Sequence, residues 1–254
     1  MELVNSIVKA AKILSLLEEH GSLSFNELIR LYELPKSTLS KTLHTLEAEQ
    51  FIRKEKETNR YKLGNRLIEL GSAARASLEI RDICRPFMNS LHESLDLTVH
   101  LGIMAHGEVL PIESVESGNW YWHHFKYPVS VGISAPLYAT GAGKAILAFL
   151  QPEEIEQILD RKLISFTKST KSDRSALLAD LDAIRKRGYA VSNAEHDEMI
   201  RSIASPIFNS DGKVIASLSV LGLAQKINEK KIEEISEKVL TATKEISHIF
   251  GYSD

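Results

Sequence analysis

Hydrophobic residues near the start of the chain recur at the three- and four-residue spacing of an amphipathic helix. The spacing predicts a helix over residues 4–19, which the His-Gly pair at 20–21 ends. We expect its inward face to consist of Ile7, Ala10, Ala11, Leu14 and Leu17.

A second, shorter helix follows the same spacing. Ser24 and, three residues later, Glu27 form a capping box, in which each side chain bonds the backbone of the other residue. This box predicts a helix over residues 25–32. Leu28 and Leu31 are expected to turn inward.

A third helix opens at Ser37 and Thr38, directly after the Leu34-Pro35 turn. Its apolar stripe is Leu39, Leu43 and Leu46, and its opposite face is Lys36, Ser37, Ser40, Lys41 and His44. The stretches FIRKEK and RYKLG, with the turn ETN between them, then predict a hairpin. Its apolar contacts come from Ile52, Tyr61 and Leu63.

Three short helices followed by a basic hairpin are typical of a winged helix-turn-helix that binds DNA. The polar face of the third helix can enter a major groove and reach base edges. The hairpin carries cations that can hold phosphates, namely Arg53, Lys54, Lys56, Arg60 and Lys62. A small helical domain with a solvated polar face is the alternative interpretation of this pattern.

The rest of the chain alternates helical and strand patterns. Residues 66–95 continue helical, with Pro86 at an expected break or new first turn, and they suggest a linker helix that leads into a second domain. Strands are expected at 97–105, 108–115, 188–193, 202–209 and 213–222, and helices at 141–150, 152–159, 173–187 and 228–250. Helices around a mostly antiparallel sheet predict an α/β sensor-like domain, and the α+β class for the chain.

Composition and charge add a mild basic bias to the first segment. The 254 residues are 43% hydrophobic and 26% charged, with a net charge of −3, as in a soluble globular protein. Residues 1–75 hold 12 basic and 10 acidic residues, whereas the rest of the chain holds 19 and 24. The bias suggests phosphate contacts, although a mixed charged surface is also ordinary.

Several classes of protein are disfavoured. No apolar run approaches the roughly 20 residues that span a bilayer, and the first residues lack a signal-peptide pattern, so a cytoplasmic protein without membrane contact is expected. The single cysteine, Cys84, excludes an internal disulfide and a multi-cysteine zinc site. It lies in an apparent helix, and we interpret it as a packed structural thiol.

Six stretches, in their order and spacing, carry a resemblance. They are AAKILSLL, LPKSTLSKTLHTLEAEQFIRKE, RYKLGNRLIELG, SAPLYATGAGKAILAFL, LDAIRKRGYAVSNAEH and ASPIFNSDGKVIASLSVLG. With them nearly the whole chain resembles the isocitrate-lyase-regulator (IclR) family of bacterial transcription factors. The resemblance implies a winged helix-turn-helix over 1–65, a linker helix over 66–80 and a GAF-like α/β effector-binding domain over 81–254. It also implies a homodimer or dimer of dimers on a pseudo-palindromic DNA operator, with a small organic acid or related metabolite as effector.

The resemblance places the recognition helix at PKSTLSK, where Pro35 is expected to shape the turn and not to touch DNA. Ser40 stands where the family often has His, and Lys41 where it often has Arg. Lysine cannot reproduce the two-pronged hydrogen bonding of arginine. The expected DNA contacts are Lys36, Ser37, Thr38, Ser40, Lys41, His44, Arg53, Lys54 and Arg60.

The sequence GAGKA at 141–145 is not a phosphate-binding P-loop. That motif needs Gly where Tyr138 stands and Ser or Thr where Ala145 stands. Its first residues instead open a helix whose N–H groups favour an anion, and in the resembled family this turn approaches the effector. A glycine turn needed only for tight packing is the alternative.

Effector contacts are carried over from the resemblance, position by position. They are His124, Tyr127, Ala135, Gly141, Ala142, Ser192, Ile200, Ser202, Ser219 and Leu221. The serines could instead be strand hydroxyls that are satisfied within the fold.

Residues 120–128, WYWHHFKYP, gather both tryptophans of the chain with two histidines and two tyrosines. We expect this segment at the rim of the effector pocket, with core and interface aromatics as the alternative. Adjacent histidines diverge on a strand, which disfavours a metal site. An aromatic rim opposite Leu221 and Ile200 predicts an acid that is larger or more apolar than a two- or three-carbon one.

The stretch NAEHDEM at 193–199 gathers three carboxylates and one His, and we interpret it as a solvated turn rather than a metal site. The catalytic motifs GxSxG and HExxH are absent, so no catalytic residue, metal or cofactor is expected. The sequence therefore predicts a ligand-responsive DNA-binding regulator and not an enzyme. A winged-helix adaptor that docks a partner protein, and an enzyme fused to a DNA-binding domain, are the alternatives.

Overall fold

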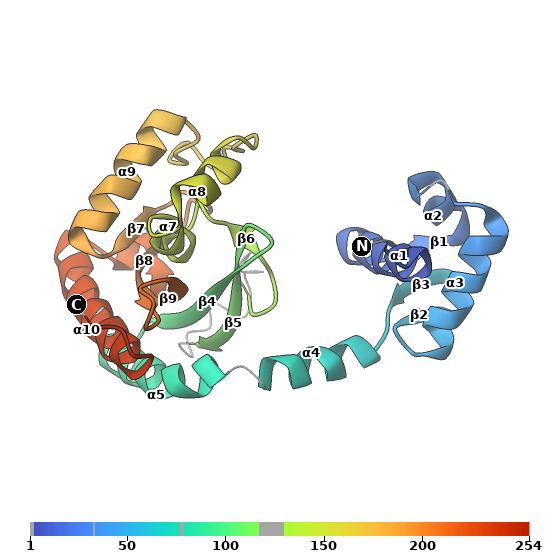
Figure 1. Cartoon of the computed structure of the whole chain (residues 1–254), viewed down its shortest axis with the longest axis horizontal. Helices are drawn as coiled ribbons and strands as arrows, with labels where there is room; N and C mark the ends of the chain where they lie inside the picture. The colour runs from blue at the N-terminus through green and yellow to red at the C-terminus, as the bar shows by residue number, and fades with distance from the viewer. Residues whose placement is uncertain (1–2, 33, 77–78, 117–129, 254) are drawn as a thin grey trace. The chain divides into compact units, whose positions relative to one another are not determined.

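The structure of the chain, a computed structural model, describes residues 3–32, 34–76, 79–116 and 130–253. The chain divides into two compact units, Met1–Leu78 and Glu79–Asp254. Each unit has its own sheet (Figure 1). Each also has its own cluster of buried apolar residues. Within the described ranges, no helix is long and apolar enough to cross a membrane.

The first unit contains the three predicted helices and the predicted hairpin. Its elements are α1 (Asn5–His20), α2 (Phe25–Tyr32), α3 (Lys36–Ala48), β2 (Ile52–Lys54), β3 (Arg60–Leu63) and α4 (Arg66–Ala76). The sequence analysis missed the short strand β1 (Leu23–Ser24), which pairs antiparallel with β3. The sheet order β1-β3-β2 completes a winged helix-turn-helix.

The buried stripes of α1 and α2 are rotated from the predicted ones. In α1 the core cluster takes in Ala10, Leu14 and Leu17 as predicted, together with Ile13 and Leu16. Ile7, by contrast, is 66% exposed, because the contacts of α1 with the cluster begin only at Ala10.

In α2 the side chains in the cluster follow the spacing 25, 28, 29 and 32, so that Leu28 is buried as predicted. Leu31 lies off this stripe and is 47% exposed, against the prediction. The capping box at the start of α2 is confirmed. The Ser24 amide donates to Glu27 Oε2 at 2.7 Å, and the Glu27 amide donates to Ser24 Oγ at 3.3 Å.

The second unit follows the predicted alternation of helices and strands. Its elements are α5 (Glu79–Leu95), β4 (Thr98–Ala105), β5 (Glu108–Val115), β6 (Ala135–Pro136), α7 (Gly141–Leu147), α8 (Pro152–Leu159), α9 (Arg174–Arg187), β7 (Ala190–Asn193), β8 (Ile200–Phe208), β9 (Val214–Leu223), the 3₁₀ turn η1 (Ala224–Lys226) and α10 (Glu229–Ile249). The sequence analysis missed β6 and η1, which are two and three residues long.

Pro86 neither breaks a helix nor begins one, because it lies inside α5. A proline there removes one helical hydrogen bond, at a cost on the order of 3 kcal/mol. Burial of Cys84, Met88, Leu91 and Leu95 along one face of α5 offsets this cost. Cys84 is the packed thiol that we expected, and burial raises its pKa to about 12.

The sheet of the second unit has the order β6-β5-β4-β9-β8-β7, with antiparallel neighbours throughout its described pairs. Neighbouring strand residues point to opposite faces. On β8, Ser202 contacts the start of α7, whereas Ser205 contacts Thr243 of α10, so these two helices cover opposite faces (Figure 1). Residues His106 and Gly107, with φ of 54° and 80°, close the β4–β5 hairpin.

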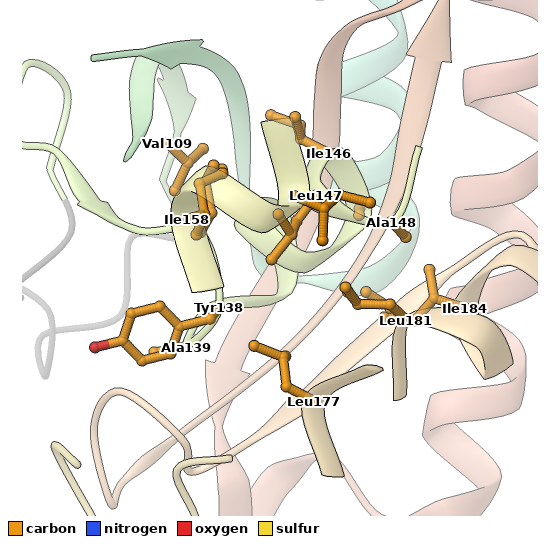
Figure 2. Packing of buried hydrophobic residues seen from close by; sticks show 14 of the residues in the cluster. Val109, Tyr138, Ala139, Ile146, Leu147, Ala148, Ile158, Leu177, Leu181 and Ile184 are labelled. Atoms are coloured by element: carbon orange, nitrogen blue, oxygen red, sulfur yellow. The ribbon is translucent and has the colours of Figure 1, made fainter. Parts of the chain in front are cut away.

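A large apolar cluster supports the α7 side of the sheet. Figure 2 shows side chains of α7, α8 and α9 packed together, among them Ile146, Leu147, Ile158, Leu177, Leu181 and Ile184. Several of these residues are completely buried. The cluster therefore holds α7, and the turn that precedes it, firmly against the sheet.

Candidate functional site

The polar face of α3 lies on the surface of the first unit. Lys36, Ser37, Ser40, Lys41 and His44 are exposed, and Thr38 is half-buried. The opposite face is core, since Leu39, Leu43 and Leu46 are at most 6% exposed. One helix thus presents an uninterrupted polar face on a fixed apolar base, as direct reading of base edges requires.

The side chains of this face fall into two kinds. Those of Thr42 and Thr45 donate back to the carbonyls of Thr38 and Lys41, at 3.0 Å in both cases, so they are engaged within the helix. The exposed Ser37, Ser40 and Lys41 side chains make no such bond within the described part of the chain and point to solvent. They remain our predicted groove contacts.

The basic hairpin, or wing, consists of β2 and β3, and its cations are in unequal positions. Arg53 and Lys54 are exposed, with the Lys54 Nζ 5.4 Å from the centre of the Tyr61 ring. Lys62 forms an ion pair with Glu55, with Nζ and Oε1 2.6 Å apart. The first two cations are accessible from solvent, whereas the third is partly neutralised.

Arg60 is engaged inside the first unit. Its guanidinium donates to the Ser22 hydroxyl at 3.1 Å and to the Ser22 carbonyl at 2.9 Å. It also lies 2.9 Å from the Glu27 carboxylate. The bonds from the Ser24 amide and hydroxyl, together with Arg60, lower the pKa of Glu27 to about 2. Arg60 therefore ties the wing to the start of α2, a role that the sequence did not indicate.

The second unit contains a cavity of about 540 Å³, including its open mouth, on the α7 side of the sheet. It is lined by His100, Gly102, Val109, Pro111, Thr140, Ala142, Ser192, His196, Asp197, Ile200, Ser202, Ser219 and Leu221. Six of the expected effector contacts are brought together here, namely Ala142, Ser192, Ile200, Ser202, Ser219 and Leu221. His124 and Tyr127, with the whole segment 120–128, lie outside the described residues.

Two other expected contacts lie next to the cavity without lining it. Ala135 is 1% exposed and belongs to the apolar cluster, where β6 pairs with β5. Gly141 opens α7, and its amide donates to Ser202 Oγ at 3.2 Å. A Cβ on Gly141 would come within 2.6 Å of the same oxygen, so glycine is needed for this close approach.

The start of α7 is mostly occupied by the protein itself. Thr140 caps the helix by accepting from the Gly143 amide at 3.0 Å, and the Gly141 amide is bound by Ser202. A Cβ on Gly143 would lie 2.5 Å from the Leu137 backbone. Both glycines thus serve tight packing, the alternative that the sequence left open, and they leave little of the helix end for an anion.

The sequence analysis missed part of the cavity wall. These residues are His100, Gly102, Val109, Pro111, Thr140, His196 and Asp197. Strand pairing could have indicated two of them. His100 lies opposite Ser219 and Gly102 opposite Ser217 between β4 and β9, so they share the face of the expected Ser219 and Leu221.

The two imidazoles of the wall are held in the neutral form. Burial lowers the pKa of His100 to about 4. Burial also lowers the pKa of His196, and the nearby Asp197 carboxylate opposes that shift. The His196 ring packs against Phe166, with ring centres 4.8 Å apart.

The segment 193–199 is not simply a solvated turn, because Glu195 is only 3% exposed. Its Oε1 accepts from Lys144 Nζ at 2.7 Å. Lys144 itself is completely buried and also donates to Asp180 and to the Val191 carbonyl, each at 2.8 Å. A buried ammonium requires such partners, so the carboxylate of Glu195 serves the interior and the prediction for this residue was wrong.

We call Lys144, Asp180, Glu195 and Lys171 the Lys144 cluster. It connects α7 with the 193–199 segment, and both of these contribute residues to the cavity lining. Lys144 follows the lining residue Ala142 by two positions on α7, and Glu195 precedes the lining residue His196. Lys171 reaches Asp180 at 2.8 Å from the surface side. Burial lowers the pKa of Lys144, and Glu195 and Asp180 oppose this shift.

Within the described ranges, no group of three or more His, Cys, Asp or Glu side chains could hold a metal ion. His196 and Asp197 adjoin on the cavity wall, but two such ligands do not form a site. The arrangement can bind a small molecule and can contact DNA. It offers no nucleophile with an oriented base in the described part of the chain.

Comparison with known proteins agrees along the whole chain. The sequence family described as "Bacterial transcriptional regulator IclR C-terminal" matches residues 72–248, and the one described as "IclR helix-turn-helix domain" matches residues 6–56. Among curated proteins, the HTH-type transcriptional regulator XynR of Escherichia coli (strain K12) is 30% identical over 254 residues, which cover 99% of each chain. The HTH-type transcriptional regulator KipR of Bacillus subtilis (strain 168) is 31% identical over 98% of each chain.

Solved structures show the same architecture. The crystal structure of the Thermotoga maritima IclR superposes with a TM-score of 0.73 at 33% identity, covering 98% of this chain and 99% of that one. The likeness therefore covers both units and the connection between them.

Proposed function

The chain belongs to the IclR family of bacterial transcriptional regulators, and we propose that it is a ligand-responsive, sequence-specific DNA-binding regulator that senses a small organic acid or related metabolite. Regulators of this family bind DNA and small-molecule effectors, and the relatives are regulators and not enzymes. The observation that carries the proposal is the exposed polar face of α3, backed by the buried Leu39, Leu43 and Leu46.

In the proposed complex, α3 lies in the major groove. Ser37, Thr38, Ser40 and Lys41 reach base edges, with Lys36 and His44 at the two ends of the same face. Lys41 contributes a point charge with rotatable donors, so it favours guanine acceptors less strictly than a planar guanidinium would.

Arg53 and Lys54 of the wing hold phosphates, because both are exposed. Arg60 also lies on the wing, but its bonds to Ser22 and Glu27 make it a positioning residue for the wing before it is a phosphate contact. Its contribution to DNA affinity is therefore the smallest of the three.

The effector occupies the cavity of the second unit, against Ala142, Ser192, Ile200, Ser202, Ser219 and Leu221. A concave site lined by apolar side chains and a few convergent polar groups is the usual kind of site for a small metabolite. We propose a functional division into a DNA-binding domain at 1–65, a linker helix at 66–80 and an effector domain at 81–254. The helix α4, Arg66–Ala76, occupies most of the proposed linker.

We propose further that a homodimer or dimer of dimers binds a pseudo-palindromic operator. Two recognition helices would then meet half-sites about one helical turn, or roughly 34 Å, apart. Effector binding that changes the spacing of the two helices shifts operator affinity, since each state presents a different spacing. Sedimentation of the full chain, with and without operator, gives the number of protomers.

A gel-shift titration of the intergenic DNA upstream of the gene tests the proposed function. We expect a retarded complex that survives excess non-specific competitor and weakens steeply with salt, because phosphate contacts release counterions. Folded protein that retards no DNA at low salt would refute DNA binding. An adaptor that docks a partner protein would also retard no DNA, so a retarded complex excludes the adaptor alternative.

A further inference from the structure

The wall of the cavity is richer in polar groups than the sequence indicated. Seven of its thirteen described residues carry a polar side chain. They are His100, Thr140, Ser192, His196, Asp197, Ser202 and Ser219. They come from four strands, from the turn before α7 and from the 193–199 segment.

The strand register aligns the polar groups of the sheet in two rows. Ser202 of β8 lies opposite Ser192 of β7 and opposite Leu221 of β9. His100 of β4 lies opposite Ser219 of β9. Directly opposed residues point to the same face, with their Cβ atoms about 5 Å apart.

The hydrogen bonds already made within the protein leave both donors and acceptors for a ligand. Ser202 Oγ accepts from the Gly141 amide at 3.2 Å, and its own proton has no acceptor among the described residues. Ser192 Oγ donates to the Ala139 carbonyl at 3.2 Å and so keeps its lone pairs. A hydroxyl both donates and accepts and can satisfy this pair, whereas a carboxylate only accepts and a hydrocarbon does neither.

The charges on the described wall disfavour an anion. No Lys or Arg is among its described lining residues, and Asp197 is acidic. The imidazoles of His100 and His196 are neutral near pH 7, because burial lowers their pKa values. Lys144 stands behind the wall, but its ammonium is bound to Asp180 and Glu195.

We propose that the described walls of the cavity bind a hydroxyl-rich, uncharged segment of the effector, with Ser192 and Ser202 as the residues that select it. The proposal rests on the proposed function and narrows its effector class. A carboxylate, where the effector has one, lies away from these walls. The free hydrogen-bonding capacity of Ser192 and Ser202 distinguishes this proposal from the larger or more apolar acid that an aromatic rim opposite Leu221 and Ile200 led us to expect.

Matched ligands separate hydroxyls from charge and from carbon content. Calorimetric titration of the full chain would compare five- and six-carbon aldonates, the corresponding alditols, pentanoate, hexanoate and benzoate. We expect at least one hydroxylated compound to bind about 100-fold or more tightly than hexanoate, because a site built for hydroxyls rejects analogues that lack them. If an aldonate binds more tightly than the corresponding alditol, the effector is a hydroxylated acid. If the two bind equally, the effector is a neutral polyol.

The two serines provide the second arm. We expect Ser192→Ala and Ser202→Ala each to weaken the best hydroxylated probe about tenfold, in line with the loss of one hydrogen bond to a ligand. Hexanoate affinity should not change. The matched control is Ser217→Ala, since Ser217 is buried on the same face of β9 but does not line the cavity, and its Oγ has no partner among the described residues.

Three outcomes overturn the proposal. In the first, hexanoate or benzoate binds as tightly as every hydroxylated compound. In the second, none of the hydroxylated compounds binds. In the third, Ser217→Ala weakens binding as much as Ser192→Ala and Ser202→Ala do, when all three variants keep the parent melting temperature. Gel shifts on the same samples separate a failure of the hydroxyl proposal from a failure of the proposed DNA-binding function. DNA that is retained, and released by benzoate alone, refutes the hydroxyl proposal and leaves the regulator intact. Binding of an alditol or aldonate by protein that retards no DNA supports the hydroxyl proposal and refutes the proposed DNA-binding function.

Discussion

The two candidate sites place polar side chains in opposite surroundings. On α3 they are exposed and lie on a separate apolar base formed by Leu39, Leu43 and Leu46. In the cavity, Ser192 and Ser202 are bonded to backbone atoms of the interior, and the completely buried Lys144 donates to the Val191 carbonyl next to Ser192. Changes on α3 should therefore alter binding without altering stability, whereas changes at the cavity wall should couple the two.

The largest effect that tests this contrast is expected at Lys144. Replacement by Met removes the buried cation and leaves Asp180 and Glu195 with only the partly exposed Lys171, and breaking a buried pair in this way costs about 3–5 kcal/mol. Denaturant unfolding followed by circular dichroism measures this loss of stability.

The matched control is Lys171→Met, which removes a cation from the same two carboxylates. Lys171 is 34% exposed, so solvent screens its ion pairs and the loss should stay below about 1 kcal/mol. Equal losses for the two variants would contradict the distinction between a buried and a surface cation. The first unit should unfold unchanged in both.

The next effect is expected on DNA affinity. Lys41→Ala should weaken binding to the upstream DNA by about tenfold and flatten the salt dependence by about one ion, without a change in unfolding free energy. Fluorescence anisotropy at several salt concentrations measures both quantities. The control is Lys162→Ala, an exposed lysine of the second unit. A loss of stability in Lys41→Ala would show that α3 is not an independent binding face.

A smaller difference separates two arginines of the wing. Arg53→Gln should reduce DNA affinity several-fold and leave the melting temperature unchanged, because Arg53 is exposed. Arg60→Gln should lower the melting temperature of the first unit, since it loses the bonds to Ser22 and Glu27. Melting curves measure the change in stability and anisotropy titrations measure the change in DNA affinity. Equal changes in both quantities for the two variants would show that Arg53 and Arg60 do not differ in role.

The smallest effect concerns pH. Glu27 has a pKa of about 2 in the folded chain against 4.5 as its ordinary value, so its contribution to stability is complete above the latter and is lost as pH falls towards the former. The melting temperature of Glu27→Gln should therefore approach that of the parent as pH is lowered from 6 to 3. A difference in melting temperature between Glu27→Gln and the parent that grows on acidification would contradict a lowered pKa for Glu27.

The face of α3 and the effector cavity differ in how far the sequence predicts them. The α3 surface depends on contacts within one helix and an adjacent hairpin, so helical spacing and capping located Ser37, Ser40 and Lys41 directly. The cavity depends on pairing between strands that are far apart in the chain. His100 and Ser219 are neighbours across β4 and β9, which no local pattern reveals.

The role of Lys144 illustrates the same limit. GAGKA and NAEHDEM lie far apart in the sequence, and three carboxylates close together usually indicate an exposed, solvated turn. Only the fold brings Lys144 and Glu195 within 2.7 Å and buries both. Pro86 is a further case, because the packing of α5 outweighs the local preference of proline.

The most direct test of the central claim is an anisotropy titration of the full chain on labelled upstream intergenic DNA, at one salt concentration, with and without the best-binding compound of the hydroxylated panel. A ligand-responsive regulator should bind this DNA at least about 1,000-fold more tightly than scrambled DNA of the same length. The compound should change the specific affinity by about fivefold or more. Equal affinity for both DNAs, unaffected by any compound of the panel, would contradict the account.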